Sequence, residues 1–513
     1  MPSVVSLIHD IARLHSGRTA LVDLAWDEAA HRYRPSSSIS YATLYARTLR
    51  FTDALARRGV KAGDRVAVLL DNGFEMVVTE WGCLLTGFLW IALNARSSPH
   101  EQELILADCT PSVLVVAAKY RASLASITLP STCRVIEVGG DWEAMLAEAT
   151  ARRPEKEPGP EDPVRIRYTS GTAGHPKGAV LARRCYDASV EAVTDVLAPL
   201  HANDVLAQVA PMTHASGAMW LPHAAVGARA LLADRFEAAA FLDLVASEGV
   251  TAAFLVPTML VRLLEAVGNP EGLRSLRAIV YGGASMPVDR LEKGIALLGP
   301  VFVQIYGLTE SNWPVTSLRR ADHVVDGPAE TRRRRLASCG RPTAVGEVRI
   351  VDDRGREVGP GEAGEMLVRG LNTMSGYWGK AADSAKGLDA DGWMHTGDVA
   401  VRDEDGFVTI VDRLHDMIVS GGFNVYPREV EDALSSHGAV LESAVVGLPD
   451  PEWGERVHAV VVPRPGAVLD EAELAAHVAS RTAGYKKPRS FEFVTELPKN
   501  AAGKVLRRAL RRS

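Results

Sequence analysis

The sequence has little of what marks secreted, membrane-spanning or nucleic-acid-binding proteins. Five cysteines occur among 513 residues, an odd number without C-x-x-C spacing, which argues against a disulfide framework and favours reduced thiols in the cytoplasm. The longest apolar run, residues 81–93, is interrupted by glycines and is shorter than the roughly 20 residues of a membrane span. It is typical of a buried helix passing into a strand. Residues 1–15 lack the basic-then-apolar order of a signal peptide.

The excess of one sign of charge over the other is also small. The formal net charge is −6, so the sequence indicates no surface that wraps nucleic acid. Hydrophobic residues make up 47% and charged residues 23%, as in ordinary globular proteins. A chain of 513 residues exceeds the size of one hydrophobic core, so we expect two or more domains.

Short apolar segments separated by helical spacing dominate the first part of the chain. This pattern predicts α/β sheets of the parallel type, which bind ligands at the carboxyl ends of their strands. The predicted strands are 65–70, 113–116, 205–209, 252–256, 278–281 and 301–305. From about residue 346 onward, Gly, Asp and Pro turns split the strands, which predicts a small antiparallel sheet or barrel. A compact α+β part follows, so we expect domains 1–413 and 414–513.

One turn, residues 168–178, concentrates hydroxyl residues, three glycines and a lysine. Such turns hold polyphosphates, because glycine lets backbone N–H groups approach closely and lysine adds a mobile positive charge. Apolar Val164 and Ile166, two residues apart, predict a strand before the turn. The turn departs from the Walker A motif, since Pro176 and Gly178 stand where that motif has glycine and Ser or Thr. A plain surface turn would need fewer glycines and no lysine.

Four further segments place glycine, hydroxyl or charged residues near predicted strand ends. They are 282–284, 306–310, 393–398 with 412–413, and 498–504. Each alone has an ordinary explanation as a turn, a helix cap, a surface ion pair or part of a basic tail. The first two follow strands of one predicted parallel sheet, so we expect them to share a crevice with the glycine-rich turn.

Together and in this order, the five segments resemble the motifs of the adenylate-forming superfamily: acyl-CoA synthetases, peptide-synthetase adenylation domains and luciferases. The resemblance extends from about Ser40 to Arg508, and residues 412–431 look most like the acyl-CoA ligase branch. It implies a large N-terminal domain of parallel-type α/β sheets with a small β-barrel, followed by a small mobile α+β domain. It also implies that a carboxylate attacks the α-phosphate of ATP to give acyl-AMP and pyrophosphate, before transfer to coenzyme A.

The residues present suit this chemistry. A carboxylate is already an anionic nucleophile at neutral pH, so no general base is needed. The barrier consists mainly of charge repulsion and alignment, which cations, backbone donors and Mg²⁺ lower. We therefore expect ATP, Mg²⁺ and coenzyme A as cofactors and a small carboxylic acid as substrate.

The resemblance assigns roles to the matching residues. The β- and γ-phosphates would be held by Thr169, Ser170, Gly171, Thr172 and Lys177. The adenosine would contact Gly283 and Ala284 along the adenine, Tyr306 stacked on it, and Asp398 and Arg413 at the ribose. The reaction centre would comprise Thr309 at the α-phosphate, Glu310 as Mg²⁺ ligand, and Lys504 between the carboxylate and the α-phosphate.

Lys504 lies far along the chain from the other nucleotide residues, so the resemblance implies that the C-terminal domain closes over the cleft. The same domain would then rotate, and Gly421 and Gly422 would flank the pantetheine tunnel. The hinge position carries His415, where the family usually has Asp or Lys. We expect the hinge to work, because a flexible solvated residue can absorb the change in φ and ψ. Ala173 replaces a commoner threonine and removes one hydroxyl donor from the phosphate turn.

Motif alignment places the acid against His214, Met219, Ser285, Asn312 and Trp313. His214 would either gate the pocket or pack in the core, and both readings stay open. The indole of Trp313 would shorten the cavity, whereas the small residues 215–217 would widen it. This combination favours an aromatic or a short-to-medium acyl acid.

Two other functions stay open. An enzyme with the same first step would pass the acyl group to a carrier-protein thiol or another nucleophile, although residues 421–427 favour coenzyme A. A non-catalytic nucleotide- or acyl-binding protein on the same scaffold is the second alternative, and the presence of Lys177, Glu310, Asp398 and Lys504 argues against it. The sequence leaves open whether the protein is a monomer or a homodimer.

Overall fold

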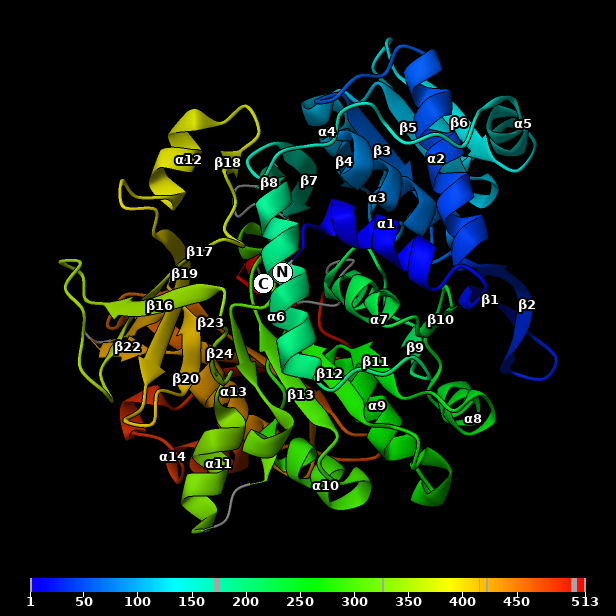
Figure 1. Cartoon of the computed structure of the whole chain (residues 1–513). Coiled ribbons are helices and arrows are strands. Elements are labelled where there is room, and N and C mark those ends of the chain that lie inside the picture. Colours follow the sequence, from blue (N-terminus) through cyan, green and yellow to red (C-terminus); the bar gives the residue numbers. More distant parts are fainter. Residues whose placement is uncertain are drawn as a thin grey trace.

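The computed structural model describes residues 2–169, 176–324, 327–414, 416–420, 423–499 and 505–511 (Figure 1). Seven predicted site residues lie outside the described residues: Ser170, Gly171, Thr172, His415, Gly421, Gly422 and Lys504. The chain is a mixed α/β protein with a large N-terminal part built on sheets and a small C-terminal part, which confirms the predicted fold class. Within the described residues the strands form four sheets.

The largest sheet has nine strands. They are β1 (Thr19–Asp27), β2 (Arg32–Ser40), β9 (Val205–Gln208), β10 (Arg229–Leu232), β11 (Ala252–Leu255), β12 (Ala278–Gly282), β13 (Phe302–Tyr306), β14 (Thr316–Leu318) and β15 (Arg341–Pro342). Their order is β15-β14-β13-β12-β11-β9-β10-β1-β2. The strands from β13 to β1 run parallel, and antiparallel strands close both edges. The predicted parallel arrangement is thus correct for the centre of this sheet.

The second large sheet has seven strands. They are β3 (Arg65–Leu69), β4 (Leu89–Ala92), β5 (Val113–Ala117), β6 (Arg134–Val138), β7 (Pro163–Thr169), β8 (Lys177–Ala182) and β18 (Gly376–Tyr377). Their order is β18-β8-β7-β4-β3-β5-β6, and β8 and β18 are antiparallel to their neighbours. The short β18 comes from a distant part of the sequence and brings residues near 377 beside the glycine-rich turn.

Two smaller sheets complete the molecule. The first is fully antiparallel and contains β16 (Gly346–Val351), β17 (Ala363–Gly370), β19 (Met394–Arg402) and β20 (Val408–Arg413), as predicted for this region. The second lies in the C-terminal part and contains β21 (Ile418–Ser420), β22 (Phe423–Val425), β23 (Val440–Asp450), β24 (Gly454–Pro463) and β25 (Ser490–Phe493).

The helices cover the sheets. Their bounds are α1 (Val4–Leu14), α2 (Tyr41–Arg57), α3 (Phe74–Thr86), α4 (Pro99–Cys109), α5 (Gly140–Glu148), α6 (Arg183–Leu197), α7 (Trp220–Ala225), α8 (Ala238–Glu248), α9 (Pro257–Ala266), α10 (Val288–Leu298), α11 (Ala329–Ala337), α12 (Ala381–Gly387), α13 (Pro427–Ser435), α14 (Glu471–Ala479) and α15 (Arg507–Leu510). Local sequence fixes several starts. At α4, Ser98 and Glu101 form a reciprocal capping box that satisfies exposed N–H groups of the first turn.

The main core lies between the two large sheets, on α1, α2, α3, α6 and α7 (Figure 1). Strand side chains alternate: Val280 of β12 faces these helices, whereas Ile279 and Tyr281 face the layer of α8, α9 and α10. Because both faces are covered, the central strands are mostly apolar, with Gln208 in β9 and Gln304 in β13 as exceptions. Trp81 and Trp220 are fully buried and stack with ring centroids 6.2 Å apart. Truncating a tryptophan in such a core costs about 3–5 kcal/mol.

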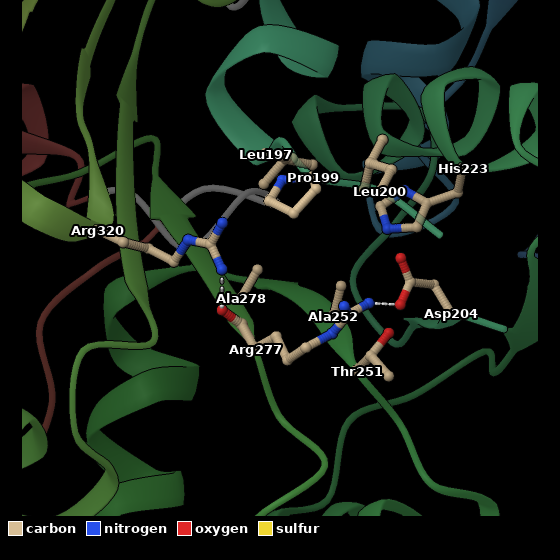
Figure 2. Close-up of a pocket in the computed structure, with 10 residues that line it drawn as sticks. All are labelled: Leu197, Pro199, Leu200, Asp204, His223, Thr251, Ala252, Arg277, Ala278 and Arg320. Carbon is tan, nitrogen blue, oxygen red and sulfur yellow. Dashed lines mark hydrogen bonds and ion pairs between the residues drawn. The ribbon is translucent and has the colours of Figure 1, made fainter. Parts of the chain in front are cut away.

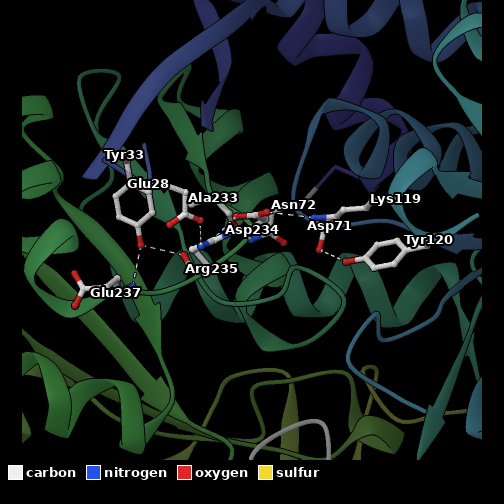
Figure 3. A network of polar contacts seen from close by, with 10 residues as sticks. All are labelled: Glu28, Tyr33, Asp71, Asn72, Lys119, Tyr120, Ala233, Asp234, Arg235 and Glu237. Atoms are coloured by element: carbon white, nitrogen blue, oxygen red, sulfur yellow. Dashed lines mark hydrogen bonds and ion pairs between the residues drawn. The ribbon is translucent and has the colours of Figure 1, made fainter. Parts of the chain in front are cut away.

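A polar network joins the ends of strands from the two large sheets (Figure 3). Lys119 Nζ lies 2.7 Å from Asp71, which follows β3, and 3.2 Å from Asp234, which follows β10. The amide nitrogen of Asn72 lies 2.9 Å from the carbonyl oxygen of Ala233. These contacts hold the carboxyl ends of the two sheets together, at the edge where parallel strands bind ligands.

The hairpin of β1 and β2 was not predicted from the sequence. Most residues of β2 are exposed, so the strand lacks the alternation of apolar and polar residues that reveals a half-buried strand. Residues 81–93 do pass from the buried α3 into β4, as predicted. All five cysteines carry free thiols. Within the described ranges, the helices are too short or too polar to cross a bilayer.

Candidate active site

The glycine-rich turn connects two antiparallel strands. β7 pairs with β8 as far as Thr169 opposite Lys177, and residues 170–175 between them lie outside the described residues. A Walker A loop leads from a strand into a helix, whereas this turn leads into a second strand. The topology therefore agrees with the sequence in excluding a P-loop nucleotidase.

Lys177, the predicted phosphate ligand, lies beside α12 and β18. Its Nζ is 3.1 Å from Asp383 and 5.3 Å from the centre of the Tyr377 ring. The side chains of Lys177 and Asp383 are 31% and 33% exposed. An ion pair this accessible to water contributes at most about 1 kcal/mol, so an incoming phosphate can displace Asp383 at little cost.

The turn after β13 contains η5 (Thr309–Ser311) and is held in place by close packing. A Cβ atom at Gly307 would lie 2.6 Å from Trp313 Cδ1, so only glycine fits there without a shift. Asn312 has φ +36°, in the left-handed region that asparagine tolerates better than most residues. Its amide donates to the carbonyl of Cys185 in α6 at 2.9 Å. The backbone around Thr309 and Glu310 is therefore fixed by α6.

Glu310, the predicted metal ligand, contacts the segment around β18. Its Oε1 accepts a hydrogen bond from the Tyr377 hydroxyl at 3.0 Å, and its carbonyl accepts one from Met374 N at 2.7 Å. Burial and the adjacent carboxylate raise the pKa of the Tyr377 phenol, so the hydroxyl keeps its proton. Tyr377 thus touches both Glu310 and Lys177.

A second polar cluster forms around Tyr306, at the end of β13 where the same turn begins. The Tyr306 hydroxyl donates to Asp398 Oδ2 at 2.5 Å, and Arg413 Nε lies 2.6 Å from Asp398 Oδ1. Asp398 and Arg413 are opposite each other on the paired strands β19 and β20, which explains their contact. Burial and the Asp398 carboxylate raise the pKa of the Tyr306 phenol. Tyr306, Asp398 and Arg413, three of the predicted adenosine residues, therefore form one connected cluster.

β7 contributes a cation to the same region. Arg167 Nη1 donates to Asn312 Oδ1 at 3.0 Å, and the guanidinium stacks 4.2 Å from the centre of the Trp313 ring. Burial and the neighbouring Arg165 lower the pKa of Arg167 to about 9. Among the described residues, Arg167 forms no ion pair with a carboxylate; Glu80 is paired with Arg165 at 3.2 Å.

β12 ends beside β13 in the same parallel register, with Gly282 opposite Ile305. Gly283 follows with φ +82°, a conformation that favours glycine. Ala284 and Ser285 are exposed beyond it. The predicted adenine residues therefore start from the strand next to the one that carries Tyr306, as the crevice prediction requires.

An apolar cavity lies between α6, η3 (Ala215–Met219) and the nine-stranded sheet. Its walls are Val193, Val196 and Leu197 of α6, Ala215, Ala218 and Met219 of η3, Val280 of β12 and Ile305 of β13. Met219 is the predicted pocket residue that lines it. Asn312 and Trp313 instead pack against Arg167, and the exposed His214 lies 2.7 Å from the Thr213 hydroxyl through Nδ1.

These features agree with what is known of related proteins. The AMP-binding enzyme family model matches residues 8–378, and the model of the AMP-binding enzyme C-terminal domain matches residues 429–504. This chain belongs to the AMP-binding enzyme family. The family assignment confirms the predicted adenylate-forming superfamily and its acyl-CoA ligase branch.

Individual relatives match over nearly the whole chain. A feruloyl-CoA synthase of Amycolatopsis is 38% identical over 93% of this chain and 94% of its own length. An indoleacetate–CoA ligase of Aromatoleum aromaticum is 37% identical over 92% of both chains. The structure of o-succinylbenzoate CoA synthetase from Bacillus subtilis with its acyl-adenylate intermediate has a TM-score of 0.84 and 30% identity, covering 98% of this chain and 97% of that one.

The described residues contain no group of three or more His, Cys, Asp and Glu side chains that would hold a metal ion by themselves. Glu310 is a single carboxylate. Mg²⁺ is commonly bound by one or two carboxylates together with substrate phosphates and water. The site therefore fits a Mg²⁺ ion that arrives with ATP.

Sequence reasoning missed three contributors to this region. The role of Tyr377 follows only from its contact with Glu310, and that of Arg167 from its contacts with Asn312 and Trp313. These partners are far away in the sequence. Arg167 carried one available signal, because a charged residue in a strand that is otherwise buried needs a polar partner. The α6 side chains in the apolar cavity gave no signal, since they look like any helix core.

Proposed function

We propose that this protein activates a carboxylic acid with ATP, forming acyl-AMP and pyrophosphate, and then transfers the acyl group to coenzyme A. One observation carries the proposal: the segment from Tyr306 to Trp313 contributes a residue to each of two polar clusters, Glu310 to one and Tyr306 to the other. Lys177, Tyr377 and Glu310 form the first, which suits phosphates and their metal. Tyr306, Asp398 and Arg413 form the second, which suits a nucleoside.

The chain's own residues perform binding and charge neutralisation. The Lys177 ammonium exchanges Asp383 for phosphate oxygens, and the backbone and hydroxyls of 169–172 donate to the same phosphates. Asp398 accepts hydrogen bonds from ribose hydroxyls, with Arg413 holding its carboxylate in place. Thr309 donates to the α-phosphate. Lys504 pairs with the substrate carboxylate and the α-phosphate, so two anions can approach.

Glu310 would hold Mg²⁺ through its carboxylate, oriented by the Tyr377 hydroxyl. When bound, this ion neutralises charge on the ATP phosphates. No general base is required, because the acid is ionised at neutral pH.

The apolar cavity beside Met219 is the proposed acyl site. Aliphatic side chains of α6, β12 and β13 form its walls, so it favours an apolar acid body. An aromatic or short-to-medium acid fits this lining, and the named activities of the feruloyl and indoleacetate relatives support an aromatic acid. His214 lies at one end of η3 and would gate this cavity.

We further propose two functional domains, 1–413 and 414–513, with a hinge at His415. The C-terminal domain would bring Lys504 to the acid for the first step and Gly421 and Gly422 to coenzyme A for the second. The free thiols fit a reducing compartment, so we place the protein in the cytoplasm. Transfer to a carrier-protein thiol would use the same first step and is the second candidate.

Two assays test this function. Exchange of pyrophosphate into ATP that depends on a carboxylic acid reports acyl-AMP formation, and its absence with a broad acid panel would favour a non-catalytic binding protein. Formation of an acyl thioester on adding coenzyme A identifies the acceptor. Exchange without a coenzyme A thioester would favour a carrier protein or another nucleophile.

A further inference from the structure

A second, polar cavity lies beyond the apolar one (Figure 2). His223, Asp204, Arg277 and Arg320 line it, together with Leu197 and Ala278 among others. In Figure 2, Asp204 and His223 stand on one side and Arg320 on the other, and the Arg277 guanidinium reaches across to pair with Asp204. None of the motifs of the nucleotide site uses these residues.

Three features place the polar cavity beside the apolar one. Leu197 lines both cavities. Ala278 lines the polar cavity and Val280 the apolar one, and residues two apart on a strand share one face of the sheet. Met219 lines the apolar cavity, and its carbonyl is the hydrogen-bond partner of His223 Nδ1 at 2.7 Å.

His223 presents an unused hydrogen-bond acceptor. A carbonyl oxygen only accepts, so the contact with Met219 places the proton on Nδ1. Burial lowers the pKa of His223 to about 4, so the ring is neutral at physiological pH and Nε2 carries a lone pair. That atom is buried and has no partner among the described residues. A buried polar atom left in this state requires an explanation.

His323 is a second buried histidine, and its Nε2 does have a hydrogen-bond partner. It is also buried and neutral, and its Nδ1 likewise lies 2.8 Å from the carbonyl four residues earlier, that of Arg319. Its Nε2, however, lies 3.0 Å from the hydroxyl of Tyr281. Nε2 of His323 therefore has a hydroxyl group as its hydrogen-bond partner, whereas Nε2 of His223 has no partner among the described residues.

Two arginines line the same cavity as His223. Arg277 is paired with Asp204, yet its Nε has no partner in the described structure. Arg320 donates to the carbonyl of Arg277 at 3.2 Å and to that of Ala198 at 2.7 Å. An acceptor and a donor that line one small cavity, both without a partner among the described residues, are together complementary to a hydroxyl, which donates one hydrogen bond and accepts another.

We propose that this cavity is a distal subsite of the acyl pocket and binds a hydroxyl group at the far end of a medium-length, otherwise apolar carboxylic acid. The hydroxyl donates to His223 Nε2 and accepts from Arg277. The inference rests on the proposed function. Ala278 and Gly282 are four residues apart along β12, about 13 Å at 3.3 Å per residue. With its carboxylate at the Gly282 end of β12 and its hydroxyl beside Ala278, the acid is therefore about 13 Å long from carboxylate to hydroxyl.

Acid-dependent pyrophosphate exchange with matched acids tests the subsite. The long pairs are decanoate with 10-hydroxydecanoate, and 6-phenylhexanoate with 6-(4-hydroxyphenyl)hexanoate. We expect the hydroxylated member of each long pair to have about tenfold higher kcat/KM. Hexanoate with 6-hydroxyhexanoate is the short pair. Its hydroxyl stops inside the apolar cavity, so here the plain acid is preferred.

Variants of His223 isolate the acceptor. His223→Asn keeps a donor near the position of Nδ1 and lacks the distal acceptor, so the tenfold preference falls to about one while decanoate turnover is retained. His223→Gln places a carbonyl oxygen near the position of Nε2 and keeps part of the preference. His323→Asn is the matched control at the other buried histidine, and it leaves the preference unchanged.

The outcomes separate this inference from the proposed function. Equal kcat/KM within both long pairs would overturn the subsite and indicate that water occupies the cavity. Exchange with benzoate or hexanoate but with neither long pair would also overturn it, while the proposed function stands. Absence of exchange with every acid would overturn the proposed function itself.

Discussion

At the scale of single residues, Tyr377 is the side chain whose role the contacts define most sharply. Its hydroxyl donates to Glu310 at 3.0 Å, and the face of its ring lies 5.3 Å from the Lys177 ammonium. One residue therefore orients the proposed metal ligand and the proposed phosphate lysine. Because the hydroxyl and the ring act on different partners, substitution can separate the two effects.

Tyr377→Phe should weaken Mg²⁺ dependence selectively. The variant keeps the ring beside Lys177 and loses the hydrogen bond to Glu310, so the Mg²⁺ concentration for half-maximal exchange rises about three- to tenfold, as expected for about 1 kcal/mol. Binding of Mn²⁺–ATP, followed by electron paramagnetic resonance without acid, should weaken by a similar factor. Tyr120→Phe is the control, since it removes an equivalent phenol–carboxylate bond to Asp71 at 2.7 Å. Equal metal dependence in both variants would contradict this role.

Two carboxylates on β1 should respond to pH in opposite directions. Burial, reinforced by Glu75, raises the pKa of Asp23 from 3.8 to about 7. Between these two values the folded protein holds a proton that the unfolded chain has lost, so stability falls as pH rises. Asp23→Asn should therefore stabilise the fold by roughly 2–4 kcal/mol at pH 8 and by little at pH 4.

Asp27 gives the matched contrast. A backbone hydrogen bond from Ala30 is the main cause that lowers its pKa, and Arg34 contributes. Its stabilisation is present above pH 4 and is lost as the pH falls further, so Asp27→Asn destabilises at pH 8 and is neutral in acid. Chemical denaturation of the three proteins at about pH 3, 5 and 8 checks both signs, the lowest pH for Asp27 and the upper two for Asp23. A constant difference between Asp23→Asn and wild type would rule out the protonated Asp23.

At the scale of elements, β7 connects the core to the turn that carries Thr309 and Glu310. The contacts of Arg167 with Asn312 and Trp313 bridge the two large sheets at this point. Arg167→Met keeps the aliphatic stem and removes the hydrogen bond and the cation–π contact, together worth about 1–3 kcal/mol. We expect a loss of stability in this range and about tenfold slower exchange.

Arg349→Met provides the comparison for Arg167. Arg349 stacks 4.4 Å from the centre of the Trp393 ring in the four-stranded sheet, away from the turn. The Arg349→Met variant should lose some stability and keep the wild-type rate of pyrophosphate exchange. Thermal denaturation and exchange kinetics on both variants separate positioning from general packing. If Arg167→Met exchanges at the wild-type rate, the bridge has no part in positioning the turn.

At the scale of the whole molecule, the proposed cycle depends on the C-terminal domain. Lys504→Ala should slow exchange by about 10²–10³, by analogy with removing one donor at a charged transition state. Hydrolysis and thioester formation from chemically prepared acyl-AMP should be affected much less. An unchanged exchange rate would refute the role of Lys504.

His415→Pro should produce the opposite pattern. Proline fixes φ at the proposed hinge, so the domain can still close for the first step but cannot rotate for the second. We expect measurable exchange and impaired thioester formation with coenzyme A. Equal loss of both half-reactions would place the hinge elsewhere.

Local sequence determined the parts of this protein that depend on local chemistry. The glycine-rich turn, the strand ends at 282–284 and 306–310, and the central strands follow from glycine conformation, phosphate chemistry and apolar periodicity. The family follows from their order. The polar and mostly exposed β2 could not be predicted, because it carries no such periodicity.

Tertiary structure alone decided which residues meet. Tyr377 reaches Glu310 across 67 positions, and Arg167 reaches Asn312 across 145. Among the described residues, Nε2 of His223 is buried without a donor, whereas Nε2 of the similar His323 is hydrogen-bonded to Tyr281. Propensity and spacing act over a few residues, while packing brings together side chains from distant elements, so these contacts could not be predicted from the sequence.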